Sequence, residues 1–248
     1  MPVGQDIVSG FNEALNKADQ ILSDFLDQSG SAWETWEPKD PVPDVSFEEF
    51  DYNKHFAETI INSCHNSASN GTLTIPSIVG GYPAIPTGTF TSISPAVCTW
   101  KEGTDLQGHI NVLYNHLKGS LPAPGGSPSP TAMLDLAMCM ADVLSAMVTG
   151  GEISAKGVVG TFTVPGSPPV TTVVSVDVSG TLVGSSSVLA SLIFQVLDMP
   201  SKPPVPNEVT GELIGTAFIT YCASLTGSVI GSGAGAACAG AGAGFVVV

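Results

Sequence analysis

The chain has 248 residues, of which 22 are Asp or Glu and only 7 are Lys or Arg, so its formal net charge is −15 at pH 7. All seven basic residues are lysines. Nucleic-acid binders neutralise phosphates with Lys and Arg and use Arg for bidentate contacts, so this composition argues against a nucleic-acid partner. The same charge disfavours attachment to an anionic membrane surface and phosphate clamping by arginine.

The first 53 residues differ in composition from the rest of the chain. Apolar side chains recur every three or four residues over 5–27, which predicts an amphipathic helix with an acidic outer face. Residues 28–53 contain three prolines and are interpreted as an extended acidic arm. Residues 1–58 hold 13 of the 22 acids but 3 of the 7 lysines. We therefore expect a helix-and-arm segment at 1–53, and no signal peptide because no basic leader precedes an apolar run.

The central part, 54–230, alternates between helical and extended patterns. Apolar spacing and capping residues predict four helices, at 55–67, 105–118, 132–147 and 185–198. Residues 152–183 predict two strands around a Pro/Gly turn, whereas 210–225 fits either helix or strand. The predicted fold class is α+β, with helices packed on short antiparallel β-ribbons in one core.

The segment 231–248 is rich in Gly and Ala, and we expect a tail that either packs between subunits or frays. It lacks the flanking Lys, Arg and Trp of a membrane span, so no transmembrane segment is expected. A short internal echo, Gly-Thr-Phe-Thr at 88–91 and again at 160–163, fits either a duplication or chance. A second echo pairs 149–153 with 210–214.

No pattern in the chain predicts a catalytic, cofactor or metal site. The glycines at 231–236 fit a loose dinucleotide motif, but no acidic residue follows them. The five cysteines and four histidines show no zinc-ligand spacing, and no nucleophile elbow occurs. We expect reduced, buried thiols, with one or two disulfides as the alternative. The chain is therefore not expected to be an enzyme, and a hydrolase with an unrecognised site remains an alternative.

Large rings are concentrated on the acidic arm. Aromatic side chains among prolines and acids are typical of segments that dock into a partner's pocket, where Trp and Tyr act as hot spots. The alternative is that the rings fold back onto the chain's own core. We predict partner binding by Trp33, Trp36, Phe47, Phe50 and Tyr52.

The chain combines an acidic amphipathic helix, a Pro-rich arm, the ribbon sequences GTFTVPG and VSGTLVG, and a GSGAGAACAGAGAGF tail. In this it resembles virion structural proteins of tailed bacteriophages, of the neck, tail and baseplate type. The resemblance implies a non-enzymatic assembly component of a virion, a homo-oligomer within a larger hetero-assembly that contacts other structural subunits through its terminal arms. The alternative is an adhesin-like binding module.

Overall fold

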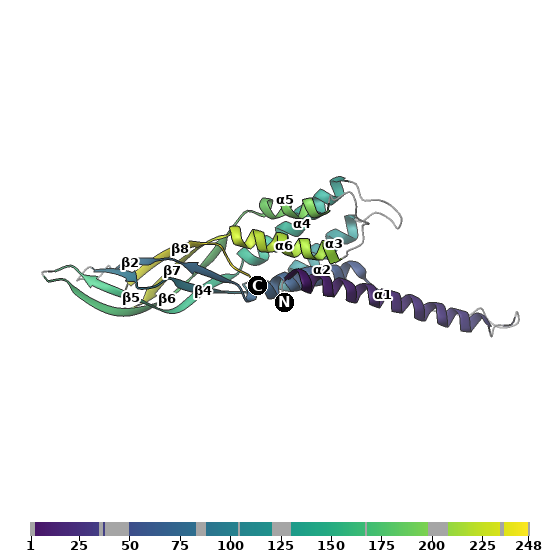
Figure 1. Ribbon diagram of the computed structural model, residues 1–248, viewed down its shortest axis with the longest axis horizontal. Helices are drawn as coiled ribbons and strands as arrows, with labels where there is room; N and C mark the ends of the chain where they lie inside the picture. Colours follow the sequence, from purple (N-terminus) through teal and green to yellow (C-terminus); the bar gives the residue numbers. More distant parts are fainter. Residues whose placement is uncertain are drawn as a thin grey trace.

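The computed structural model divides the molecule into a helical half and a strand half (Figure 1). The six helices of the described residues lie together at one end, and the strands run away from them as an elongated body. Both chain termini lie where the two halves meet. The structure describes residues 3–34, 37, 50–82, 88–103, 105–120, 130–166, 168–197, 208–233 and 236–247.

The helices form a closed ring in chain order. Each helix packs against the next, and the last packs against the first. Apolar faces and caps explain where they form: Asp51, for example, accepts a hydrogen bond from the Lys54 N–H at 3.1 Å and begins the second helix. The helices are α1 (Val3–Glu34), α2 (Tyr52–Ser69), α3 (Leu106–Ser120), α4 (Pro130–Thr149), α5 (Ser186–Leu197) and α6 (Glu208–Ser224).

All the named strands belong to one antiparallel sheet, and the sheet closes into a barrel. Around the barrel, β5 pairs with β6, then β7, β8, β2 and β3 follow, and β3 pairs with β5 again. Closer to the helices, β1 and β4 replace β2 and β3, and β1 bridges Val246. The strands are β1 (Thr72–Ile75), β2 (Ile78–Tyr82), β3 (Gly88–Ser92), β4 (Ala96–Lys101), β5 (Glu152–Val164), β6 (Val170–Val183), β7 (Thr226–Gly233) and β8 (Ala236–Ala243).

The chain consists of three consecutive units of the same design. Each unit supplies two helices and then a pair of neighbouring strand stretches that run out along the barrel and back. In the first unit the outgoing stretch is β1 with β2, interrupted at Pro76, and the returning stretch is β3 with β4. The interruption is bridged because the Ile78 N–H donates to the Ser92 hydroxyl at 3.0 Å. Helices and strands therefore alternate along the chain but separate in space.

The echo at 88–91 and 160–163 does not mark equivalent places in two units. The two Gly-Thr-Phe-Thr segments are neighbours, because β3 and β5 pair with Phe90 opposite Phe162. A Cβ on Gly160 would lie 2.3 Å from the Phe90 ring, and one on Gly88 would lie 2.3 Å from the Phe162 ring. The glycine of each motif therefore leaves room for the phenylalanine ring of the other motif. The second echo pairs residues 149–153, at the turn from α4 to β5, with residues 210–214 inside α6. These two segments therefore do not occupy equivalent places either.

The α+β class is confirmed, but three details differ from the sequence prediction. The strands form one closed sheet instead of separate ribbons, and the helices stack at its end. Helix α1 continues to Glu34 through the start of the predicted arm, because a single glycine, Gly30, does not break it. The predicted tail supplies β8, and one core extends from Val3 to Val247.

Helix α4 is the one described helix that is long and apolar enough to cross a membrane, judged by length and composition. In the structure 44% of this apolar stretch, Thr131–Thr149, is buried inside the protein. The helix packs against both α3 and α5, so part of its apolar surface faces the core, whereas Leu134 and Met138 are exposed.

Candidate functional site

Three of the five aromatic residues predicted to bind a partner cannot be assigned contacts. Trp36 and Phe47 lie outside the described residues. Trp33 lies near the end of α1, but its side chain is also outside the described part. Phe50 and Tyr52, by contrast, have defined positions at the start of α2.

Phe50 and Tyr52 join α1 to α2. The centre of the Phe50 ring lies 6.5 Å from that of Tyr52 and 5.8 Å from that of His55. The Nζ of Lys17 in α1 lies 5.4 Å from the centre of the Phe50 ring. Lys17 therefore makes a cation–π contact with Phe50 of the arm. The Tyr52 hydroxyl is buried and has no hydrogen-bond partner among the described residues, and burial raises its pKa. These two rings contact their own chain.

A second contact fixes the start of α2 against α3. The Tyr114 hydroxyl donates a 2.6 Å hydrogen bond to the Asp51 carboxylate, which also caps α2. This bond lowers the pKa of Asp51 and raises the pKa of Tyr114, because it is strongest with a charged carboxylate and a protonated phenol. The arrangement is an exposed structural clamp.

Helix α1 extends well beyond the helices that hold it (Figure 1). Its 32 residues span about 48 Å at 1.5 Å per residue. Ile7, Phe11 and Ala14 are buried where the helix packs against α2 and α6, and Phe11 stacks on Phe56 at 4.9 Å. Farther along, Leu22 and Leu26 are 50% and 58% exposed. These leucines are four residues apart and share one face of the helix. They form an apolar pair on the projecting half of α1.

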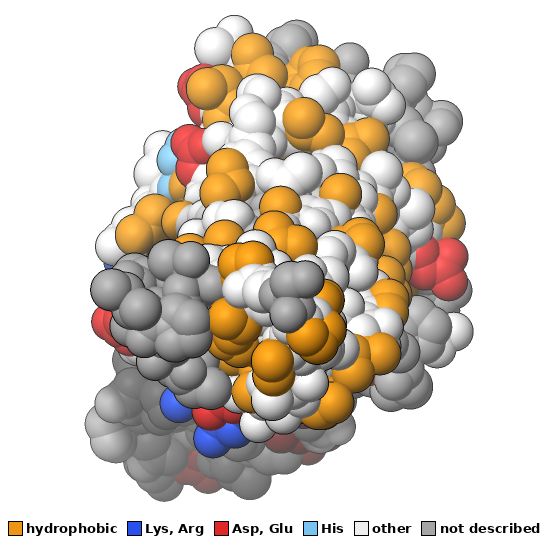
Figure 2. All heavy atoms as spheres, turned by 90° about the vertical axis from the view of Figure 1, so that its left-hand side faces the viewer, with side chains coloured by type: hydrophobic (Ala, Val, Ile, Leu, Met, Phe, Trp, Pro, Cys, Tyr) orange, Lys and Arg blue, Asp and Glu red, His pale blue; other side chains and the backbone are white. Residues whose placement is uncertain are grey.

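The outer surface of the barrel carries a continuous row of uncharged side chains. Cross-strand pairing places its members side by side across β6, β5, β3, β2, β8, β7 and again β6. We call this set the outer row; its members are Val173, Thr161, Thr91, Val79, Ala239, Ile230 and Ser179. Figure 2, which looks onto the barrel end, shows hydrophobic side chains spread among uncharged ones over this face.

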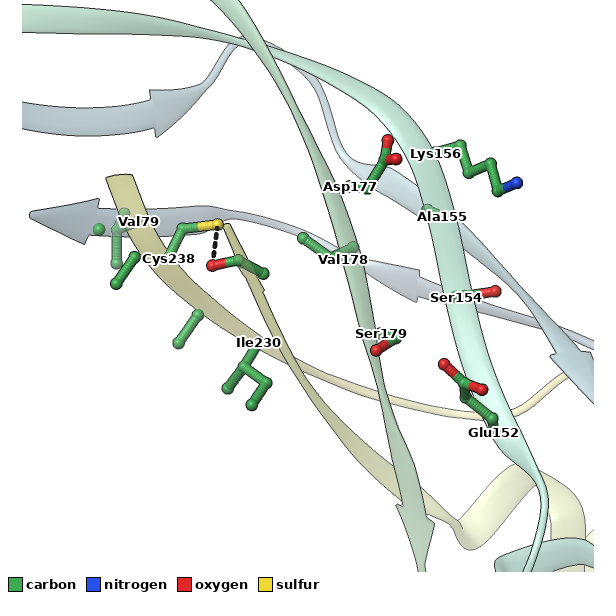
Figure 3. Close-up of a pocket in the computed structure, with 14 residues that line it drawn as sticks. Val79, Glu152, Ser154, Ala155, Lys156, Asp177, Val178, Ser179, Ile230 and Cys238 are labelled. Atoms are coloured by element: carbon green, nitrogen blue, oxygen red, sulfur yellow. Dashed lines mark hydrogen bonds between the residues drawn. The ribbon is translucent and has the colours of Figure 1, made fainter. Parts of the chain in front are cut away.

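A hollow of about 980 Å³ opens in the barrel wall (Figure 3). Its polar lining comes from β5 and β6 and includes Glu152, Lys156 and Asp177, whereas Val79 and Ile230 contribute apolar lining from β2 and β7. A β-bulge between Ala155 and Val158 shapes this wall, and Asp177 accepts a 2.7 Å hydrogen bond from the Gly157 N–H. Glu152 and Lys156 both lie on β5, whereas Asp177 lies on β6 and holds the bulge.

Several polar side chains near the junction of the two halves connect one element to another. The Ser145 and Tyr221 hydroxyls lie 2.6 Å apart between α4 and α6. The Trp100 indole N–H donates to the Val148 carbonyl at 2.9 Å, and the His65 Nε2 lies 3.1 Å from a Glu102 carboxylate oxygen. These contacts tie α2, α4 and β4 together where the helices meet the barrel. We interpret them as structural.

All five cysteines are free thiols, and Cys64, Cys98, Cys222 and Cys238 are buried. Burial raises the pKa of Cys64 and Cys222 well above the ordinary value, so both remain protonated thiols at neutral pH. Within the described residues, no three His, Cys, Asp or Glu side chains gather closely enough to hold a metal ion.

Sequence reasoning found the apolar face of α1 but missed the outer row. The signal was present: no charged residue occurs in 157–176, although Thr and Val alternate there. Thr and Val also favour strands for conformational reasons, so the pattern indicated a strand without indicating which face met water. Comparison with protein-family models, with curated proteins and with solved structures finds no match to this chain.

Proposed function

We propose that this chain is a non-enzymatic structural subunit of a multi-subunit particle, of the kind that tailed-bacteriophage virions contain in the neck, tail or baseplate. The observation that carries the proposal is the projecting half of α1, which holds Leu22 and Leu26 away from the chain's own core. A projecting helix with exposed leucines is suited to pack into a groove of a neighbour. The resemblance of the sequence to virion structural proteins supports the same role.

The electrostatics of α1 indicate the chemistry of that neighbour. Residues 3–34 carry six acids and one lysine, so the leucine face is bordered by negative charge. A neighbouring subunit with an apolar groove and a basic rim would complement this surface. Trp33 and Trp36, which follow the leucines in the sequence, are proposed to extend the same contact.

The test of this function is co-assembly in the native particle. Particles are purified from the natural source, and their subunits are identified and counted by mass spectrometry. We expect this chain at several copies per particle in fixed stoichiometry. Its recovery only as a free chain, with no particle-bound fraction, would contradict the proposal.

Two variants distinguish loss of the proposed contact between subunits from loss of the chain's own stability. The double change Leu22→Ser and Leu26→Ser should weaken incorporation by at least about 2 kcal/mol, the size of an interface hot spot. Thermal stability of the isolated chain should change little, because both leucines are exposed. Val112→Ser on α3, at a valine that is also more than half exposed, is the matched control and should assemble normally.

A binding module of the adhesin type is the second candidate. The observation that favours it is the hollow in the barrel wall, which has one polar and one apolar side. Retention of the chain on glycan arrays or cell surfaces, lost on Lys156→Ala, would support that function. Normal incorporation of Lys156→Ala into particles and no retention would favour the structural role.

A further inference from the structure

The outer row is more apolar than the water-facing side of an antiparallel sheet usually is. Such a sheet normally alternates apolar residues inside with polar residues outside. Here the inner positions are apolar, yet Val173, Val79 and Ile230 are 69%, 54% and 72% exposed on the outside. Val79, Ala239 and Ile230 are direct cross-strand neighbours, so this part of the row is contiguous apolar surface, which marks sites of interaction.

Neighbouring side chains widen the row into a band. Val159, two residues before the row's Thr161 on β5, is exposed, and Ile93, which donates its backbone N–H to the Val159 carbonyl at 3.0 Å, is exposed as well. The remaining members of the row are Thr, Ser and Ala, whose side chains bring no charge into the band.

A partner can cover this band only by packing its side chains against the outside of the barrel. Each long strand stretch has a paired neighbour on both sides, so the ring of strands offers no free edge along the row. Addition of a partner's strand, the usual route for sheet surfaces, therefore does not apply here. A partner must lie across the outside of the barrel.

The charges of the chain point to the kind of partner. The named strands contain Lys101, Lys156, Glu152 and Asp177, two positive and two negative charges that sum to zero. The remaining residues hold 20 acids and 5 lysines, which gives the whole net charge of −15. Two copies that met through their helical halves would bring two strongly negative surfaces together. Two copies that met through their barrels would not.

We propose that the outer row is a contact surface for a second copy of this chain, barrel against barrel. The inference deepens the proposed function, on which it rests, because a subunit present in several copies needs a contact between copies. It assigns the copy-to-copy contact to the neutral barrel and leaves the acidic α1 for a different subunit. A self-complementary patch of this kind produces a two-fold contact when the same residues meet from both sides.

The salt dependence of self-association follows from this assignment. Raising NaCl from 0.05 to 0.5 M shortens the screening length from about 14 Å to about 4 Å. Screening weakens the repulsion between the acidic helical halves and leaves the apolar barrel contact intact. Self-association should therefore become tighter in high salt, which is the opposite of the behaviour of an interface built on ion pairs.

The test is sedimentation equilibrium of the purified full chain from 1 to 200 µM at both salt concentrations. We expect concentration-dependent association that tightens at least threefold in 0.5 M NaCl. Ile230→Asp and Val173→Asp should each raise the dissociation constant at least tenfold. Because both side chains are mostly exposed, circular dichroism and the thermal midpoint should remain those of the unaltered chain. Val112→Asp on α3 is the matched control and should associate normally.

Three results would overturn the inference. The first is a chain that stays monomeric throughout the concentration range in both salts. The second is association that Ile230→Asp and Val173→Asp leave unchanged. The third is a monomer that instead floats with phosphatidylcholine vesicles, which would assign the row to a lipid surface. Failure here with normal, α1-dependent incorporation into particles would remove the copy-to-copy contact while leaving the proposed function in place.

Discussion

The two halves of the molecule use different means to specify their structure. The helical half has a conventional apolar core, capping side chains and a solvent face dominated by acids. The barrel half has valines and threonines outside, and inside it depends on glycines that let strands and rings approach closely. Substitution of a glycine packed inside the barrel should therefore have the opposite consequence to substitution of Gly30, which has open space around it in α1. Net charge should matter for the helical half and not for the barrel.

The largest loss of stability is expected from substitution of Gly180 in β6. A Cβ at this position would lie 1.8 Å from the Ser228 carbonyl oxygen, which is backbone and cannot move aside without parting β6 from β7. Gly180→Ala should destabilise the fold by about 3 kcal/mol, at the upper end for overpacking. Urea unfolding measures the change.

Gly30 in α1 is the matched control in the helical half. Nothing lies within 4 Å of a Cβ placed there, and the residue is inside a helix. Gly30→Ala should stabilise the protein by up to about 1 kcal/mol, because alanine has the higher helix propensity. Equal losses of stability at both glycines would show that the close approach of β7 to Gly180 is not what makes that position sensitive.

These glycines also show why the barrel could not be predicted from the sequence. The helices were predictable because their apolar spacing is local, and β5 and β6 because Thr and Val alternate around a Pro/Gly turn. Strand β8, with the sequence AACAGAGA, has none of the residues that favour strands. It is a strand because β2 and β7 pair with it from both sides, and Gly80 allows β2 to approach it closely.

The arrangement in three units could not be predicted from the sequence for a related reason. The segments that repeat in sequence are the proline-rich connections between paired helices, PKDPVP at 38–43, PAPGGSPSP at 122–130 and PSKPPVP at 200–206. Each segment interrupts helical periodicity locally, and nothing in one of them relates it to the next. Of the predicted partner-binding residues, Phe50 and Tyr52 contact α1 and α2, which no local pattern indicated.

The next largest effect on stability is expected at the pair of buried hydroxyls between α4 and α6. Ser145→Ala removes the hydroxyl that lies 2.6 Å from the buried Tyr221 hydroxyl and leaves that group unpaired. We expect a loss of about 2 kcal/mol in the free energy of unfolding. Adding Tyr221→Phe should recover much of that loss, because neither polar group then remains buried. Additive losses in the double variant would show that the two hydroxyls act independently.

A smaller effect is expected from salt on the free energy of unfolding. The helical half carries the net negative charge, so screening should stabilise it modestly between 0.05 and 0.5 M NaCl. Neutralising acids on the outer face of α1, as in Asp24→Asn with Asp27→Asn, should reduce this salt dependence. A charge-neutral change on the barrel, Thr161→Val, should leave it unaltered.

The smallest effect is the pH dependence of the Asp51–Tyr114 clamp, which Tyr114→Phe removes. The folded protein lowers the pKa of Asp51, so the stability gained from this carboxylate is present above the unfolded-state pKa near 3.8 and is lost as the pH falls through the folded pKa. It raises the pKa of Tyr114, so the phenol's contribution is present below pH 10 and is lost as the pH rises through the higher folded pKa.

The difference in unfolding free energy between the unaltered chain and Tyr114→Phe should therefore form a plateau from about pH 5 to 9 and fall on both sides. Tyr52→Phe is the control, because the Tyr52 hydroxyl has no described partner and does not bond to Asp51. Its removal should leave the acid side of the profile unchanged and alter only the alkaline side, where burial raises the pKa of Tyr52. A flat profile for Tyr114→Phe would mean that the contact between α3 and the start of α2 does not depend on the charged carboxylate.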